Sequence, residues 1–116
     1  MSRKVTIGVN LTDTTKVTLY TVPIRNNAYW DLFYAINNGA NNKYISLFWY
    51  DKSEDTEIEI LNEYTLNAKN FLKFDGGAVV VLDQEDEIRV QQETDANISV
   101  LATVEVFPEL SVKKNN

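Results

Sequence analysis

Apolar and polar residues alternate with a period of two along most of this 116-residue chain. The pattern is clearest near the end of the sequence, where every second residue from Ile98 to Val106 is apolar. Successive side chains of a β-strand point to opposite faces, so this spacing predicts strands that bury one face in a core. The alternation therefore predicts an all-β fold.

Turn-forming residues such as Pro23 and Asn38-Gly39 separate the alternating segments. Strands are expected at residues 5–9, 16–22, 29–37, 44–50, 56–61, 68–74, 78–82, 88–92 and 98–107. Eight to nine short strands at this spacing predict an antiparallel β-sandwich. A jelly-roll-like order suits that number because it leaves few sheet edges exposed. We expect a sandwich domain over residues 1–107 and a C-terminal arm over 108–116.

For three of these segments we also predict the type of structure or the direction in which side chains point. Residues 29–37 also fit the spacing of a short helix, but aromatic residues prefer pleated surfaces, which favours a strand. Within residues 68–74 we expect Phe71 and Leu72 to point inward. Within residues 56–61 we expect Ile58 and Ile60 to face the core, with the acids between them in water.

The composition excludes several kinds of site. The chain has no cysteine and no histidine, which rules out disulfides, His-ligated zinc and Ser-His or Cys-His dyads. Its net charge is −6 and its bases are scattered, which argues against nucleic-acid binding. The longest apolar run, residues 78–82, is too short to span a membrane, and the first residues lack the apolar core of a secretory signal. We expect no nucleic acid, membrane or cofactor.

Two acid-rich segments suggest functional hypotheses. The first carries Asp51, Glu54, Asp55, Glu57 and Glu59. Carboxylates suit calcium, but this segment lacks the spacing of a calcium-binding loop, and a solvated edge strand explains it better. The second carries Asp83, Glu85, Asp86 and Glu87.

Paired carboxylates in this second segment would suit glycoside hydrolysis, but that chemistry needs a cleft large enough for a sugar. A compact sandwich of this size rarely has such a cleft. We expect Asp86 instead to bond the backbone of its own tight turn. The chain is predicted not to be an enzyme.

Aromatic residues gather between positions 29 and 50: Tyr29, Trp30, Tyr34, Tyr44, Trp49 and Tyr50. Exposed rings of this kind stack on sugars or on bases, at roughly 1–3 kcal/mol per stacked base. Tyrosine and tryptophan are also enriched at the centres of protein interfaces. We expect about half of these rings to fill the core and the others to contact another subunit.

Three short features resemble those of small β-sandwich proteins from tailed-bacteriophage particles. They are Leu-Tyr-Thr-Val-Pro at residues 19–23, an Asn-rich strand exit at 37–42, and residues 82–90, which match the pattern Leu-x-x-Gly-Asp-x-Ile-x-Val. Glu85 replaces the usual glycine of that pattern. Because non-glycine residues rarely adopt a positive φ, we expect a different turn type there. The likeness covers roughly residues 16–106.

This resemblance implies an accessory structural protein of the virion, assembled in the host cytoplasm. It implies contacts with the major capsid protein or other virion subunits, and we favour a capsid decoration or cement protein. By analogy with trimeric cement proteins we expect a homotrimer. The expected contact residues are Tyr29, Trp30, Tyr34, Trp49, Tyr50, Phe107, Leu110 and Val112. The alternatives are a tail, neck or fibre accessory, a carbohydrate-binding module for host-surface glycans, and a small glycosidase or lyase.

Overall fold

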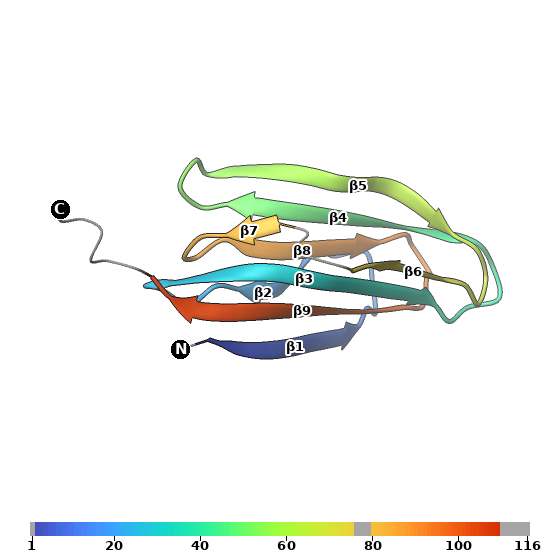
Figure 1. Ribbon diagram of the computed structural model, residues 1–116. Helices are drawn as coiled ribbons and strands as arrows, with labels where there is room; N and C mark the ends of the chain where they lie inside the picture. Colours follow the sequence, from blue (N-terminus) through green and yellow to red (C-terminus); the bar gives the residue numbers. More distant parts are fainter. Residues whose placement is uncertain (1, 76–79, 110–116) are drawn as a thin grey trace, which may run out of the picture.

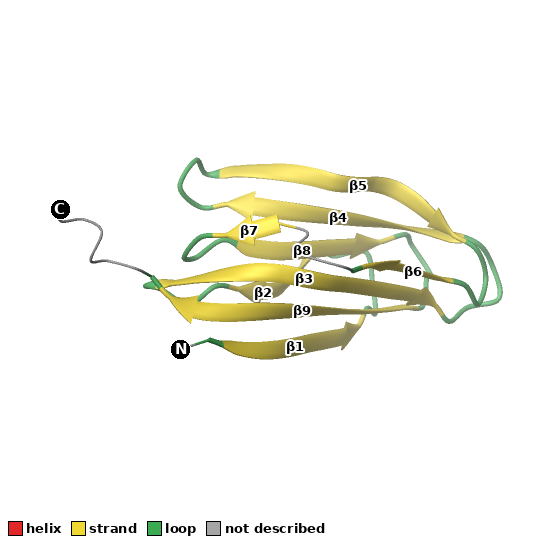
Figure 2. Cartoon of the chain, in the orientation of Figure 1, coloured by secondary structure: helices red, strands yellow, loops and turns green. Residues whose placement is uncertain are grey.

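The computed structural model describes residues 2–75 and 80–109, and every regular element in this part of the chain is a strand (Figures 1 and 2). The strands are β1 (Arg3–Asn10), β2 (Val17–Thr21), β3 (Asn26–Asn37), β4 (Lys43–Asp51), β5 (Thr56–Leu66), β6 (Phe71–Phe74), β7 (Val80–Leu82), β8 (Glu87–Gln92) and β9 (Ile98–Pro108). Residues 29–37 lie within β3, so the strand prediction is confirmed and the helical alternative is wrong. None of the described segments forms a helix with the length and apolar character that crossing a membrane requires.

The strands form two antiparallel sheets packed as a sandwich, as predicted. One sheet has the order β1-β9-β3-β6, with β7 also paired to β3, and the other has the order β2-β8-β4-β5. β6 and β7 pair with successive lengths of the same edge of β3, so together they fill one strand position. With that position counted once, the two sheets have the strand order of a jelly roll.

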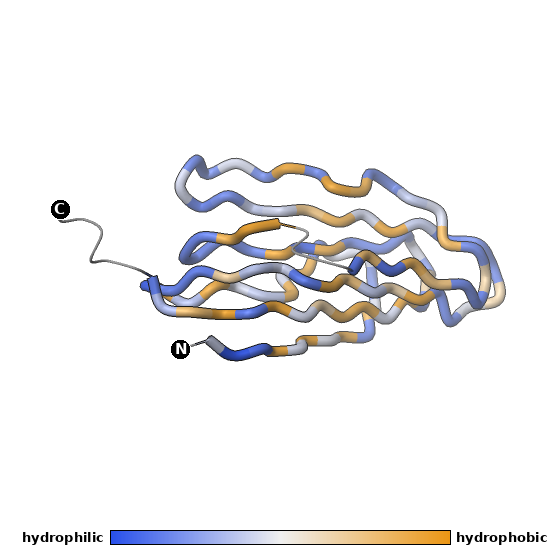
Figure 3. Tube along the Cα trace, in the orientation of Figure 1, coloured by the Kyte–Doolittle hydropathy of each residue, from blue (hydrophilic) through white to orange (hydrophobic). Residues whose placement is uncertain are grey.

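The core lies between the two sheets, where the apolar positions of each strand meet. Figure 3 shows apolar and polar positions alternating along the strands, and this alternation gives each sheet one apolar inner face. The largest fully buried apolar side chains are Trp30, Phe33, Ile45, Leu47, Leu82, Ile88 and Ile98. Each such side chain contributes roughly 1.5–3 kcal/mol when it is removed from water. A chain without disulfides is thus held together mainly by this core.

One predicted orientation is wrong, and another is right in direction but incomplete in burial. Phe71 is 58% exposed, because β6 pairs with β3 in a register that turns Leu72 and Phe74 toward the core instead. Ile58 lies opposite Trp49 on the inner side of its sheet, but β5 is an edge strand and leaves Ile58 44% exposed. The inward prediction for Leu72 is confirmed.

The turn between β7 and β8 joins two of the motifs that carry the family resemblance. Glu85 has a φ of 66°, so it keeps the left-handed conformation and the predicted change of turn type is wrong. Its N–H donates to the carbonyl of Val22 at 2.8 Å, and the N–H of Val22 donates to the carbonyl of Asp86 at 3.0 Å. Residues 19–23 and 82–90 are therefore neighbours, since β2 also pairs with β8.

Candidate contact surface

The outer faces of the two sheets differ in chemistry. We call the outer face of the five-stranded sheet the contact face, defined by outward-pointing apolar side chains from four of its strands. These are Tyr29 and Tyr34 on β3, Phe71 on β6, Val81 on β7, and Leu101 and Phe107 on β9. They point outward because they alternate with residues of the core along each strand.

One end of the contact face carries the Tyr29 patch, made of Tyr29, Val81 and Phe107. Tyr29 lies directly opposite Val81 on the neighbouring strand, and its ring centroid is 4.9 Å from that of Phe107. Tyr29 is 42% exposed and Val81 is 57% exposed. Three apolar side chains from β3, β7 and β9 thus form one water-exposed cluster.

The other end carries the Phe71 patch, made of Tyr34, Phe71 and Leu101. The rings of Tyr34 and Phe71 have centroids 5.4 Å apart and are tilted by 31°. Tyr34 also lies opposite Leu101 on β9. Between the two patches the face carries Leu32, which lies opposite Thr103, and the hydroxyls of Thr6 and Thr103, which are bonded at 2.8 Å.

The structure separates the residues that were predicted to contact a partner. Tyr29 and Phe107 lie together at one end of the contact face and Tyr34 lies at its other end, and their contact role stays a prediction. Trp49 faces the core side of β4, and Tyr50 lies on the outer face of the other sheet. Leu110 and Val112 lie outside the described residues.

The prediction that Trp30 contacts another subunit is wrong. Trp30 has no exposed surface, its ring packs edge-on to Phe33 with centroids 6.2 Å apart, and its indole Nε1–H donates to the carbonyl of Leu32. A side chain in this position stabilises the core and contacts no other subunit. Sequence reasoning also missed Phe71 and Val81 as surface residues, because exposed and buried apolar residues look alike in a sequence.

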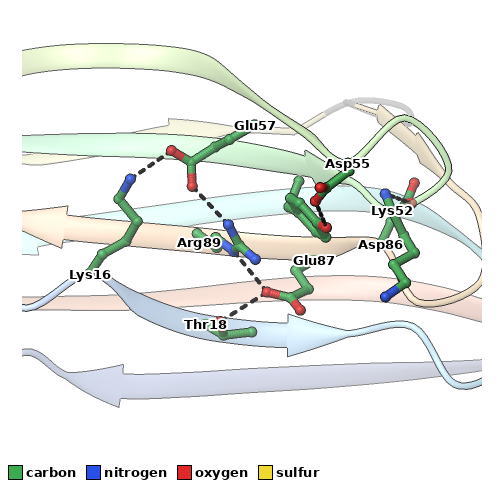
Figure 4. Close-up of polar contacts among 9 residues, drawn as sticks. Lys16, Thr18, Lys52, Asp55, Glu57, Asp86, Glu87 and Arg89 are labelled. Atoms are coloured by element: carbon green, nitrogen blue, oxygen red, sulfur yellow. Dashed lines mark hydrogen bonds and ion pairs between the residues drawn. The ribbon is translucent and has the colours of Figure 1, made fainter.

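The outer face of the four-stranded sheet carries a network that we call the charge ladder (Figure 4). Glu57 accepts hydrogen bonds from Lys16 Nζ at 2.6 Å and from Arg89 Nη1 at 3.0 Å. Glu87 accepts from Arg89 Nε at 2.7 Å and from the hydroxyl of Thr18 at 3.0 Å. Glu57 was expected to lie in water, but this network leaves it only partly exposed.

The same two cations cover two aromatic rings of this face. Lys16 Nζ lies 4.1 Å from the ring centroid of Phe48, and the guanidinium of Arg89 lies 4.0 Å from that of Tyr50. Such contacts are worth roughly 0.5–1 kcal/mol at exposed sites. A cation lies over each of these two rings, whereas Tyr29, Val81 and Phe71 on the contact face are exposed to water.

The pKa of Glu57 reflects opposing effects. Burial alone would raise it, but the hydrogen bonds and positive charges of Lys16 and Arg89 outweigh burial and hold the pKa of Glu57 below its ordinary value of 4.5. A lowered folded-state pKa means that the ladder stabilises the fold above that ordinary value. This stabilisation is lost as the pH falls through the lowered pKa.

We expect Glu57→Gln to lower the free energy of unfolding at neutral pH by up to about 1 kcal/mol, since the pair is partly exposed and screened by water. The difference from the wild type should disappear in acid, where Glu57 itself is protonated. Urea unfolding at a series of pH values measures this. Glu59→Gln is the matched control, because Glu59 is exposed on the same strand and makes no ion pair among the described residues. Equal losses for the two variants would contradict the ladder's role.

Asp86 is a buried connecting residue, 1% exposed. Its Oδ2 accepts from the backbone N–H of Asp83 at 3.0 Å and from the indole Nε1–H of Trp49 at 3.1 Å. Its Oδ1 accepts from the backbone N–H of Lys52 at 2.9 Å. The prediction that Asp86 bonds its own turn is confirmed, and the same carboxylate also ties that turn to β4 and to the β4–β5 turn.

An open hollow of about 360 Å³ lies beside this turn, with Lys52, Ser53, Asp83 and Glu85 in its lining. Burial raises the pKa of Asp83, and the negative charges of neighbouring acids add to this effect.

In the other acid-rich segment, Glu57 belongs to the ladder and Asp55 accepts a hydrogen bond from the Tyr50 hydroxyl. Across residues 2–75 and 80–109, no three acidic side chains are grouped so as to hold a metal ion, so the calcium hypothesis gains no support.

Comparison with known proteins gives a fold and no family. No family model matches the sequence, and no curated protein sequence matches it. Among solved structures, a chain from the disulfide-linked endospore appendages of Bacillus has a TM-score of 0.57 at 11% identity, over 94% of this chain and 88% of that one.

Two further solved structures are similar to the same degree. A chain from the acid-stable capsid of the Helicobacter pylori bacteriophage KHP30 has a TM-score of 0.55 at 10% identity, over 94% of this chain and 95% of that one. The Drosophila NLP core, described for its pentamer formation and histone binding, has a TM-score of 0.55 at 12% identity, over 92% of this chain and 100% of that one. At such identities the likeness shows the fold alone, and this β-sandwich recurs in a pilus, a phage capsid and a pentamer.

Proposed function

We propose that this chain is a structural protein of a bacteriophage particle, and that it decorates or cements the outer shell of the capsid. In this role it binds the major capsid protein by burying the contact face. A fold similar to that of a chain from a phage capsid supports the proposal. The sequence motifs at residues 19–23 and 82–90, which lie side by side in the fold, support it further.

The observation that carries the proposal is the chemical difference between the two outer faces. On the ladder face the rings of Phe48 and Tyr50 are covered by Lys16 and Arg89, whereas the Tyr29 and Phe71 patches are open to water. Exposed apolar patches that are rimmed by polar residues mark interaction sites in soluble proteins. Aromatic anchors also supply much of the binding energy of protein interfaces.

We further propose that the chain works in the virion as a homotrimer placed at three-fold positions of the shell. This step rests on analogy with trimeric cement proteins. Many identical contacts around a shell would then stabilise both the shell and the folded chain, because each binds the folded form of the other.

The test begins with virions purified from the phage that encodes the chain. Mass spectrometry of density-gradient particles is expected to find the chain in fixed proportion to the major capsid protein. Shells from a deletion mutant should bind purified chain added back to them. Absence of the chain from purified particles would refute the proposal.

Variants then test the contact face. We expect the double variant Tyr29→Ser, Phe71→Ser to lose binding to the deletion-mutant shells while remaining folded. Ile58→Ser is the matched control, since Ile58 is similarly exposed but lies on β5, away from the contact face. Loss of shell binding in the control alone would point to a different surface.

A second candidate function is the binding of host-surface glycans. A small hollow of about 200 Å³ at the turn between β5 and β6 is lined by Tyr64, Thr65, Leu66, Asn67, Asn70 and Phe71. Its lining has no charged side chain, and it combines two exposed rings with amides. That chemistry suits a single neutral sugar ring, which stacks on aromatic faces and bonds polar groups.

A glycan array separates the two candidates. Tyr64→Ala changes the hollow but leaves both patches of the contact face intact. Glycan binding that is lost in Tyr64→Ala, together with unchanged shell binding, would assign a carbohydrate role to the hollow. An array without any binding would remove this second candidate.

A further inference from the structure

We propose that copies of this chain join edge to edge, with the basic edge of one copy against the acidic edge of the next. The basic edge is β1, with Arg3 and Lys4, and the acidic edge is β5, with Glu59 and Glu63. The inference deepens the homo-oligomer part of the proposed function and rests on it. Binding of a shell by the contact face does not depend on it.

The topology leaves these two strands on opposite sides of the sandwich. β1 ends the five-stranded sheet beside β9, and β5 ends the four-stranded sheet beside β4. β1 lies against β2, which is the opposite end of the sheet that β5 closes. Figure 1 shows β1 and β5 as the outermost strands on the two sides. One copy therefore presents two different edges that face in opposite directions.

The two edges carry opposite charge. β1 contains two basic residues and no acid, while β5 contains three acids and no base. Of the β5 acids, Glu57 is committed to the charge ladder. Glu59 and Glu63 are exposed and form no ion pair with any other described residue.

The bases of the β1 edge are also exposed and available to a partner. The side chain of Lys4 is 68% exposed, and its nearest acid, Asp31, is 3.8 Å away, which is a loose contact. Arg3 is exposed and forms no ion pair among residues 2–75 and 80–109. Both edges thus keep exposed charges, and Arg3, Glu59 and Glu63 form no ion pair with any described residue.

These charges select one kind of pairing. Two β5 edges would set acids against acids, and two β1 edges would set bases against bases, and like charges at an interface are strongly unfavourable. Charged edge strands block aggregation for the same reason. Pairing of β1 with β5 is the combination that remains, and it is a head-to-tail interface, which closes into a ring when the rotation between copies permits.

The experiment uses two charge-reversed variants of the full chain. The basic-edge variant carries Arg3→Glu and Lys4→Glu, and the acidic-edge variant carries Glu59→Lys and Glu63→Lys. We expect the wild type to sediment as an oligomer, and each variant to associate roughly tenfold more weakly or worse. Lys52→Glu is the control for the basic-edge variant, because it also replaces a base by an acid but lies in the β4–β5 turn. It should associate as the wild type does.

Mixing the two variants is the decisive step. Each retains one native edge, and their altered edges are complementary to each other, so an equimolar mixture should form edge-to-edge pairs of unlike copies. A closed ring of three copies cannot alternate two variants, so the mixture should not rebuild a trimer. A single chain that carries all four substitutions should also assemble. Added salt should weaken every one of these associations.

Several results would overturn the inference: a monomeric wild type, variants that assemble normally, or a mixture that stays monomeric. Urea unfolding of each variant confirms that it is folded. If the edges fail these tests while the chain still binds shells through Tyr29 and Phe71, only the edge pairing is wrong. If shell binding fails while the edges assemble, the capsid role is wrong and the self-association stands.

Discussion

Trp30→Ala is expected to lower the free energy of unfolding by about 3–5 kcal/mol, the usual cost of truncating a fully buried large aromatic residue. The side chain has no exposed surface, and its removal leaves a cavity beside Phe33. It also leaves the carbonyl of Leu32 without its indole donor. Urea unfolding at neutral pH measures the change.

Tyr29→Ala is the matched control, because Tyr29 precedes Trp30 in β3 and points to the opposite face. Its loss should cost far less stability, of the order of 1 kcal/mol, which is typical of a half-exposed position. Its effect should appear in shell binding instead. Similar stability losses for the two variants would show that the sheet does not separate a core face from a contact face as described.

Asp86→Ala is expected to lower the free energy of unfolding by about 3 kcal/mol or more. The substitution removes the acceptor of three hydrogen bonds, from the N–H groups of Asp83, Lys52 and the Trp49 indole. Each buried donor left without a partner costs roughly 1–3 kcal/mol. The measurement is again urea unfolding, with the Trp49 fluorescence as a local probe.

Asp83→Asn is the control within the same turn. The pKa of Asp83 is raised by burial and by nearby acids, so its charged form is disfavoured in the folded state. Removal of that charge should leave stability unchanged or slightly higher at neutral pH. The gain should vanish as the pH falls below the ordinary value of 3.8, where the wild-type carboxyl is protonated in both states. A loss as large as that of Asp86→Ala would contradict the connecting role of Asp86.

The strands and their arrangement were predictable because alternation and turn residues are local signals. The segment 29–37 shows why a helix competed with a strand there. The register of β3 shifts between Trp30 and Leu32, so Trp30 and Phe33 both face the core although they are three residues apart. A β-bulge thus produced a spacing that imitates a helix.

The contact surface was only partly predictable, because it depends on which strands become neighbours. Tyr29 and Phe107 meet through the pairing of β3 with β9, and Val81 joins them through β7. The charge ladder likewise joins Lys16, Glu57 and Arg89 from three different strands or their ends. No local pattern in the sequence predicts contacts between residues so far apart.

The pairing of β1 with β9 governs how this chain reaches its native state. β1 is the first of the described strands, yet its partner is β9, the last of them, with Arg3 opposite Val106 and Asn10 opposite Ser99. The sandwich therefore closes only after β9 has left the ribosome, and folding dominated by such distant pairings takes about milliseconds to seconds. During that interval β1 lacks its partner, and the two cations at its start are of the kind that protects unpaired strands from aggregation.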